Sequence, residues 1–338
     1  MTATRYDLIT LGRNGMDLFA QDIGAPFAAI TGFDAHIGGS PTNIAVAASR
    51  LGLHVALLTA VGPDLVGDFV LAHLAEEGVE TRYIPRKPGT HTGLAVVGVQ
   101  PPDRFPLVFY RQNPADIWLN PDDIATAPIE QARALELSGT ALSRGTCGEA
   151  TIAAALRARA AGVTTYLDLD LRPDHWSSPA ELRAALHRLL PAIDVIIGTE
   201  EEFYALLGAT PEDVFAGKRL TGEQIAELDA LVPTFLAGRS EQTLVLKRGP
   251  RGASVLAAGQ DELRVPGFPV TVLNTVGAGD AFAGGLIYGR CQGWDWRASV
   301  RVANACGALV VTRHGCAAAM PRLEEVETFL QSQSSSLD

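Results

Sequence analysis

The stretch that decides the fold is Asn274-Thr275-Val276-Gly277-Ala278-Gly279-Asp280, residues 274–280. Val270, Val272 and Leu273 before it predict the end of a strand, and the apolar run 281–288 after it has the period of a helix. The stretch is therefore predicted to be a loop that opens a helix. Its small residues let successive backbone N–H groups point at one spot, where the positive end of the helix dipole reinforces them. We expect an anion to bind there.

Asp280 falls in the first turn of this predicted helix, beside the expected anion site. A carboxylate in that place could accept the proton of an attacking hydroxyl while the backbone N–H groups stabilise the charge on a transferred group. A base beside an anion hole is the chemistry of phosphoryl transfer to an alcohol. The alternative is an ordinary glycine-rich helix start, in which Asp280 is only a favourable charge in the first turn.

A second loop-to-helix start lies near the other end of the chain, at Gly38-Gly39-Ser40-Pro41-Thr42-Asn43. The apolar residues after it recur at helical spacing until Gly52, and Pro41 suits a first-turn position. The two glycines allow another molecule to approach the backbone, and Asn43 offers both a donor and an acceptor. Alone, this motif is a commonplace turn.

Together, the two stretches resemble the N-terminal and C-terminal signatures of the ribokinase-like (PfkB-type) carbohydrate kinases, in the order found in that family. The resemblance implies that Asp280 is the catalytic base and that the N–H groups of Gly277, Ala278 and Gly279 form the anion hole. It also implies a sugar site made by Asp17, Gly38, Gly39 and Asn43. For Asp17 the alternative is a surface aspartate in a turn.

The chain departs from the family signature at Asn274, where the family usually has Asp. That position lies near the loop that holds a monovalent cation in many members. Activation by K⁺ is therefore left open, whereas the resemblance implies ATP and Mg²⁺ as in the rest of the family.

The middle of the chain alternates between strand-like and helix-like segments, as an α/β protein does. The predicted strands are 7–12, 55–58, 134–138, 163–169 and 194–197, and the predicted helices are 66–77, 148–161 and 179–190. The pattern predicts a parallel sheet covered on both faces, with ligands at the C-terminal strand ends. The resemblance makes this a ribokinase-like three-layer α/β/α fold with a central mostly parallel sheet, in a single kinase domain over residues 1–330. The polar tail 331–338 is predicted to be disordered.

Two consecutive predicted strands, 91–99 and 107–111, have no helix between them and are joined by the turn-rich residues 100–104. Together with the segment 30–37 they predict a small sheet standing off the main domain. The family has a β-sheet lid over the sugar there, so we expect lid segments near 15–37 and 90–112. A lid excludes water, which would otherwise compete with the sugar for the phosphoryl group.

Two arginines indicate which class of sugar the site accepts. Arg111 lies at the end of a predicted lid strand and Arg172 at the end of a predicted core strand. Guanidinium groups bind carboxylates through paired hydrogen bonds, so they suit a sugar acid better than a neutral sugar. For Arg172 the alternative is an ion pair with Asp168 or Asp170. The sequence Asp170-Leu171-Arg172-Pro173, followed by Trp176, is most similar to the 5-dehydro-2-deoxygluconokinases of myo-inositol breakdown. The resemblance also makes Asp170 one of the expected substrate-binding residues. Kinases of 2-dehydro-3-deoxygluconate also carry arginines near these places.

The nucleotide side is expected at the strand 243–247 and the turn 248–252 that follows it. In the family this turn lies beside the ATP phosphates and ribose, so Lys247, Gly249 and Gly252 are predicted to bind ATP, although a hairpin turn explains the glycines equally well. The resemblance adds Thr275 and Asn304 to this set, the alternative for Asn304 being a helix-surface amide. It also points to Glu201 as an acid that helps hold Mg²⁺ through water, or simply as part of a charged first helical turn.

Charge and composition argue against other classes of protein. The 338 residues include 27 basic and 38 acidic side chains, a net charge of −11, without a long Lys/Arg cluster, which disfavours nucleic acid and anionic membranes as partners. The four cysteines show no metal-ligand or Cys-x-x-Cys spacing, so a cytoplasmic location is expected.

Lids pair two subunits in many members of the family, but no sequence feature decides whether this chain forms a homodimer. A silent sugar-binding regulator is the non-enzyme alternative; loss of Asp280 would indicate it, and Asp280 is present.

Overall fold

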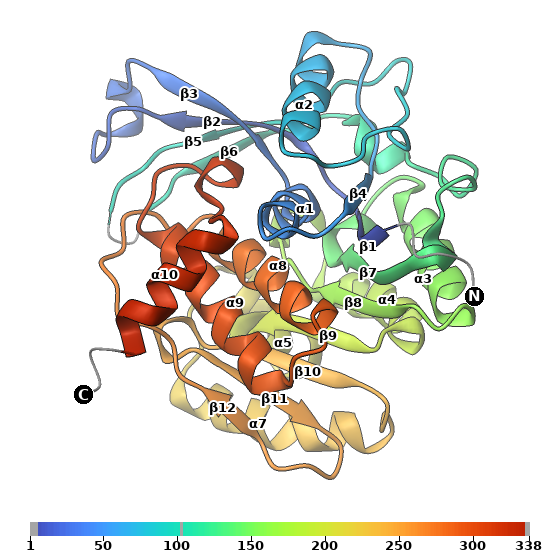
Figure 1. Ribbon diagram of the computed structural model, residues 1–338, viewed down its shortest axis with the longest axis vertical. Coiled ribbons are helices and arrows are strands. Elements are labelled where there is room, and N and C mark those ends of the chain that lie inside the picture. Colours follow the sequence, from blue (N-terminus) through green and yellow to red (C-terminus); the bar gives the residue numbers. More distant parts are fainter. Residues whose placement is uncertain (1–5, 102–103, 335–338) are drawn as a thin grey trace.

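The computed structural model describes residues 6–101 and 104–334, and its centre is an eight-stranded sheet with the order β12-β11-β10-β9-β8-β7-β1-β4 (Figure 1). The strands from β10 to β4 run parallel, and β11 and β12 are antiparallel additions at one edge. The strand bounds are β1 Tyr6–Leu11, β4 Val55–Leu58, β7 Ala132–Ser138, β8 Thr164–Asp168, β9 Val195–Thr199, β10 Thr243–Lys247, β11 Ala253–Ala257 and β12 Leu263–Val265. This arrangement confirms the predicted mostly parallel sheet.

Helices cover both faces of this sheet because alternate residues of each buried strand point to opposite sides. On β1, for example, Leu8 belongs to one apolar core and Ile9 to the other. The first core is covered by α1 (Ser40–Arg50), α8 (Ala278–Cys291), α9 (Trp296–Val311) and α10 (Leu323–Ser334), with α2 (Leu65–Glu76) beside the smaller sheet. The second is covered by α3 (Cys147–Ala160), α4 (Pro179–Leu189), α5 (Glu200–Leu207), α6 (Pro211–Phe215) and α7 (Gly222–Ala237).

The smaller sheet, at the segments where a lid was expected and called the lid below, has the order β3-β2-β5-β6. Its strands are β2 (Gly15–Ala20), β3 (Phe33–Gly38), β5 (Leu94–Val97) and β6 (Leu107–Tyr110). Asp17 is paired with Ala95, which is paired with Phe109, so these three side chains share one face of the lid. That face lines the cavity described below, and Asp17 therefore lies on a strand rather than in a surface turn.

Two local predictions are wrong. Residues 270–273 do not form a strand, because the N–H groups of Leu273 and Asn274 both donate to the carbonyl of Val311, at the end of α9, and join no sheet. The tail was expected to be disordered from residue 331, but α10 continues to Ser334, and Phe329 on this helix packs against Phe268. Residues 335–338 of the predicted tail, and residues 102–103 of the predicted turn, lie outside the described residues. In the part of the chain that is described, none of the helices has the length and apolar character to cross a membrane.

Candidate active site

A cavity open to solvent lies between the lid and the main domain. Asp17, Ala95 and Phe109 line it from the lid, Arg111 and Arg172 from strand ends, and Asp280 from the start of α8. Parallel strands bring their carboxyl ends to one edge of the sheet, and the lid strands close over that edge. Both predicted arginines and the predicted base therefore face one cavity.

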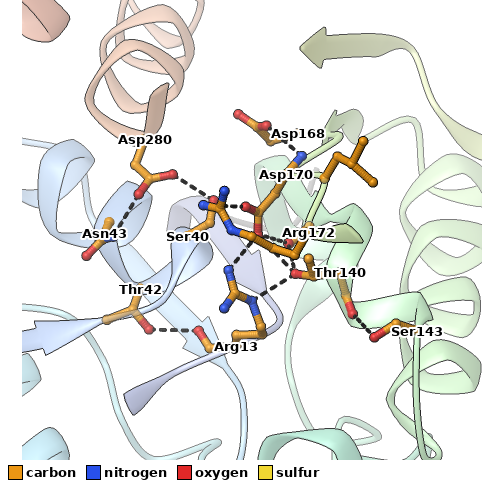
Figure 2. A network of polar contacts seen from close by, with 12 residues as sticks. Arg13, Ser40, Thr42, Asn43, Thr140, Ser143, Asp168, Asp170, Arg172 and Asp280 are labelled. Carbon is orange, nitrogen blue, oxygen red and sulfur yellow. Dashed lines mark hydrogen bonds and ion pairs between the residues drawn. The ribbon is translucent and has the colours of Figure 1, made fainter. Parts of the chain in front are cut away.

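Asp280 is held by α1 (Figure 2). Its Oδ1 accepts a hydrogen bond from Ser40 Oγ at 2.7 Å, and its Oδ2 accepts one from Asn43 Nδ2 at 2.7 Å. Burial raises the pKa of Asp280, as does the neighbouring Asp170, whereas the hydrogen bonds from Asn43 and Ser40 act in the opposite direction. A carboxylate with a raised pKa is a better proton acceptor than a free one, provided that it remains ionised at the working pH.

The turn before Asp280 has the predicted open backbone. Gly277 is the N-cap of α8 with φ 85°, in the left-handed region, and a Cβ at this position would lie 2.7 Å from Cys316 Sγ. Among the described residues, no acceptor is found for the N–H groups of Gly277 and Gly279, whereas the N–H of Ala278 donates to the carbonyl of Thr275 at 3.3 Å. Two of the three predicted N–H donors are thus free to bind an anion, and Ala278 is partly used within the turn.

The predicted sugar-binding side chains meet beside Asp280. Burial raises the pKa of Asp17 to about 6, although Arg13 and Arg111 act in the opposite direction. Gly38 and Gly39 line the cavity next to Asp17, and a side chain on Gly38 would occupy the space of the Asp17 carboxylate. Asn43 donates to Asp280 and to Cys316 Sγ, the latter at 3.0 Å, so its amide nitrogen positions the base.

The two predicted arginines differ in how far they are already paired. Arg111 binds both carboxylate oxygens of Asp116 through Nη2 at 2.7 Å, and its Nη1 donates to the carbonyl of Asn14. Arg172 lies 3.0 Å from Asp170 Oδ1, and its side chain is 43% exposed. The ion pair with Asp170, the alternative interpretation of Arg172, therefore exists, but most of this guanidinium group remains free.

Asp170 was predicted to contact substrate, and the structure instead encloses it in the protein. Its carboxylate accepts hydrogen bonds from Arg13, Ser138 and Thr140 and is not part of the cavity wall. Burial alone would raise the pKa of Asp170, but Arg172 and Arg13 more than offset this and hold it below its ordinary value. Asp170 is thus a permanently charged anchor for the arginines.

On the nucleotide side, Lys247 ends β10 beside the anion site. Its Nζ lies 3.2 Å from Asp168 Oδ2, and a Cβ added to Gly279 would also lie 3.2 Å from it. Burial alone would lower the pKa of Lys247, but Asp168 and Glu202 more than offset this, so its pKa is raised and the ammonium group keeps its charge.

The turn at residues 249–252 joins β10 to β11 as a hairpin, with Gly249 and Gly252 at positive φ. Arg248, just before the turn, and Arg251, within it, both pair with Glu200 at the start of α5, so the turn is fixed to that helix. Thr275 is exposed near the start of α8. The backbone therefore forms the hairpin that was the alternative interpretation. The hairpin turn also lies at the same edge of the sheet as Lys247.

Asn304 is not the helix-surface amide that was the alternative to its nucleotide role, whereas Glu201 lies in the charged first helical turn that was its alternative. Asn304 is buried, and its Nδ2 donates to the carbonyls of Val265 and Pro266, so this amide ties α9 to the end of β12. Glu201 is half-buried in the first turn of α5, whereas its neighbour Glu202 is used by the N–H groups of Thr199 and Leu171. Within the described residues, no cluster of three or more His, Cys, Asp or Glu side chains could hold a metal. One outer carboxylate is nevertheless enough for Mg²⁺ that is bound mainly by phosphates.

Sequence reasoning missed two residues that contact the site. Ser40 belongs to the quoted helix start, and its position before Pro41 gives no sign that it donates to a residue 240 positions away. Arg13 is the second residue after β1 and binds Asp170. Its place at the carboxyl end of a central strand was the signal that could have identified it.

Comparison with known proteins places this geometry in a family. Residues 9–323 match the pfkB family carbohydrate kinases, and the chain belongs to this family. It is 34% identical to a 5-dehydro-2-deoxygluconokinase of Geobacillus thermodenitrificans, over 96% of this chain and 93% of that protein, and 31% identical to one of Shouchella clausii, over 97% of each.

Solved structures agree on the fold. A fructokinase of Xylella fastidiosa with bound ATP superposes with a TM-score of 0.80 at 28% identity, covering 97% of this chain and 99% of that one. A ribokinase-type protein of E. coli in complex with ATP and Mg²⁺ gives a TM-score of 0.80 at 29% identity, covering 96% and 99%. The chain is therefore a sugar kinase with the ribokinase-like fold, and ATP and Mg²⁺ are consistent with these neighbours.

Proposed function

We propose that this chain transfers the terminal phosphoryl group of ATP to the C6 hydroxyl of 5-dehydro-2-deoxy-D-gluconate, giving 6-phospho-5-dehydro-2-deoxy-D-gluconate in the breakdown of myo-inositol. The observation that carries this proposal is one cavity lined by both a hydrogen-bonded carboxylate, Asp280, and the guanidinium group of Arg172. The relatives that carry this name span nearly the whole chain, which supports the same substrate.

In this proposal Asp280 accepts the proton of the attacking hydroxyl. Ser40 and Asn43 hold its two oxygens, so the carboxylate keeps one orientation without rearrangement during the reaction. The N–H groups of Gly277 and Gly279, helped by Ala278 and the α8 dipole, stabilise charge on the transferring group. Lys247 adds a positive charge next to Gly279.

The sugar acid is held through both its carboxylate and its hydroxyl groups. Arg172 binds the substrate carboxylate with its free donors, and Arg111, anchored on Asp116, adds a second guanidinium group at the same wall. Asp17, Gly38, Gly39 and Asn43 contact the hydroxyl groups near the lid, and Asp170 acts indirectly through the arginines. A neutral sugar has no carboxylate, so the free donors of Arg172 would have no partner on the substrate.

ATP is assigned to the edge of the sheet where β10 and α8 meet. Lys247, the 249–252 turn and Thr275 would face its phosphates and ribose, and Asn304 would border the adenine through the backbone that it holds. Mg²⁺, which supplies charge neutralisation on the phosphates, would be held mainly by those phosphates and through water by Glu201. The bare backbone at Gly279 fits this assignment, because a Cβ there would lie 3.2 Å from Lys247 Nζ, beside the ammonium group that would face the phosphates.

A coupled ADP-release assay over a panel of acids and neutral sugars tests the proposal. We expect turnover of 5-dehydro-2-deoxy-D-gluconate with kcat/KM well above that of 2-dehydro-3-deoxy-D-gluconate, ribose and fructose. Preference for 2-dehydro-3-deoxy-D-gluconate would favour the alternative acid, and turnover of neutral sugars alone would contradict the role of the arginines. Binding without any transfer would favour a silent sugar-binding regulator.

We also propose that two copies pair through the outer face of the lid. Eight residues on that face carry no charge and are at least partly exposed: Met16, Leu18, Phe33, Ala35, Leu94, Val96, Val108 and Tyr110. Val108 is 40% and Tyr110 63% exposed, which is unusual for a monomer surface. A second copy presents the same apolar face and can cover it symmetrically. Val108→Glu should convert a dimer to a monomer in sedimentation analysis, whereas a monomeric wild type would contradict the pairing.

We place the protein in the cytoplasm, where ATP is supplied, with no nucleic-acid or membrane partner.

A further inference from the structure

Arg13 is a third guanidinium group at the cavity, and the reaction described above gives it no role. Its side chain is 8% exposed and shares the cavity wall with Arg111 and Arg172. Its Nε donates to Thr140 Oγ1 at 2.9 Å, and its Nη2 donates to Asp170 Oδ2 at 2.9 Å. Arg13 thus joins the end of β1 to the segments that follow β7 and β8.

Asp170 lies between two guanidinium groups. Arg13 binds its Oδ2, and Arg172 lies at 3.0 Å from its Oδ1 (Figure 2). Two positive charges and one negative charge leave this cluster with one net positive charge. The side chains of Arg13 and Asp170 are 8% and 4% exposed, whereas that of Arg172 is 43% exposed. Asp280, Glu202 and Asp168 also act electrostatically on Arg172. Of the three paired groups, Arg172 is the one most exposed to the cavity.

Without Arg13, Asp170 would be the sole counter-ion of Arg172, and the cluster would be neutral. An incoming carboxylate would then have to compete for the same guanidinium group with Asp170, whose side chain is only 4% exposed. Asp170 cannot simply turn away, because its backbone is in the left-handed region with φ 36° and its Oδ2 is also bound by Ser138 and Thr140. Because the Asp170 carboxylate is fixed beside Arg172, a second cation must balance its negative charge if Arg172 is to bind the substrate.

We propose that Arg13 is the charge-balancing and positioning residue that frees Arg172 for the substrate carboxylate, and that it thereby sets the preference for a singly charged acid. This inference rests on the proposed sugar-acid kinase activity. Arg13 acts through Asp170 and takes no part in the proton transfer at Asp280. Its loss should therefore weaken binding of the acid and leave the use of ATP unchanged.

The test compares Arg13→Met, Arg13→Lys and the double variant Arg13→Met/Asp170→Asn with the wild type. The measurements are the Kd for 5-dehydro-2-deoxy-D-gluconate by calorimetry, kcat, the KM for each substrate, and Tm. Arg157→Met is the matched control, because Arg157 makes a similar paired contact with Glu130 and binds two backbone carbonyls, away from the cavity.

We expect Arg13→Met to raise the Kd and KM for the acid by about 10- to 100-fold, with kcat and the KM for ATP within about threefold of wild type. Arg13→Lys keeps the charge and should stay within about fivefold. The double variant removes one charge of each sign and restores the net positive charge on Arg172. Its affinity for the acid should return to within about fivefold of wild type.

Unchanged acid binding in Arg13→Met would overturn the proposal. So would a double variant as weak as the single one, because the effect would then come from position and not from charge. Parallel losses for acid and ATP, or an equal loss of acid affinity in Arg157→Met, would show a merely structural role. If Arg13→Met does not fold, Arg13→Lys and the double variant still decide between these outcomes. A wild type that binds D-fructose but no acid would instead contradict the proposed function, and this result is separable because it needs no variant.

Discussion

Ser40 Oγ donates a 2.7 Å hydrogen bond to Asp280 Oδ1, joining the first residue of α1 to the first turn of α8 across 240 positions of sequence. The contact is made to the charged form of the carboxylate, so it lowers the pKa of Asp280 against the raising effect of burial. A base must be ionised to accept a proton, and this bond therefore extends the active range to lower pH.

Replacement of Ser40 by alanine should raise the pKa of Asp280 and move the rise of kcat with pH upward by about one unit. The pH–rate profile measures this shift. Ser49→Ala is the matched control, because Ser49 lies on the same helix and donates to the carbonyl of Glu77, away from the cavity. An unchanged profile in Ser40→Ala would show that the hydrogen bond does not tune the base.

Asp17 should make sugar binding depend on pH, because burial raises its pKa to about 6. An ionised carboxylate accepts hydrogen bonds from two hydroxyl groups, and protonation removes part of that capacity. Affinity for the sugar acid should therefore be complete above about pH 7 and decline as the pH falls through 6. Calorimetry from about pH 5 to 8 measures this, and Asp17→Asn should bind more weakly with little dependence on pH. The same decline in Asp17→Asn would assign the effect to another group.

Gly277→Ala should damage the anion hole. The residue has φ 85°, and its new Cβ would meet Cys316 Sγ at 2.7 Å, so the N–H groups of the turn would be displaced. We expect kcat to fall by about 10²-fold or more. Gly293→Ala, at φ 77° with no atom within 4 Å of the new Cβ, is the control for backbone strain alone and should remain active. Equal activity of the two variants would exclude a role for the turn.

Asn274 bears on the open question of K⁺. Its Nδ2 donates to the carbonyl of Gly315 at 3.0 Å and its Oδ1 accepts from the N–H of Val276 at 3.0 Å, so both amide atoms are used by the protein. We expect kcat/KM to change by less than about twofold when a quaternary ammonium ion replaces K⁺. Asn274→Asp would place a carboxylate against the Gly315 carbonyl and should make the activity dependent on K⁺. Strong stimulation of the wild type by K⁺ would contradict this interpretation.

Much of the main sheet could be predicted because its buried parallel strands are short apolar runs separated by helical periods. The pattern correctly places β4 and the helices α2, α3 and α4 to within a residue or two. It fails at residues 270–273, where β-branched residues favour a strand but the end of α9 supplies the hydrogen-bond acceptor. Tertiary position overrides propensity there.

Site residues could be predicted from the sequence only where they belong to a recognisable motif. Asp280 and Asn43, 237 positions apart, were both found because each belongs to a recognisable helix start, and the structure joins them. The pair formed by Arg13 and Asp170 could not be predicted, since it depends on how the ends of β1 and β8 meet across 157 positions. Asn304 was assigned to the adenine side from the resemblance alone, and nothing in the sequence indicated that its amide nitrogen donates to two backbone carbonyls.

The most direct measurement of the central claim compares Asp280→Asn with the wild type for both turnover and binding of the sugar acid. Asparagine has nearly the same shape and can keep the contact with Ser40, but it cannot accept the proton. The account predicts a fall in kcat of about 10²- to 10⁴-fold with the Kd for the acid within about threefold. An Asp280→Asn variant that retains more than about a tenth of the wild-type kcat would show that another group removes the proton.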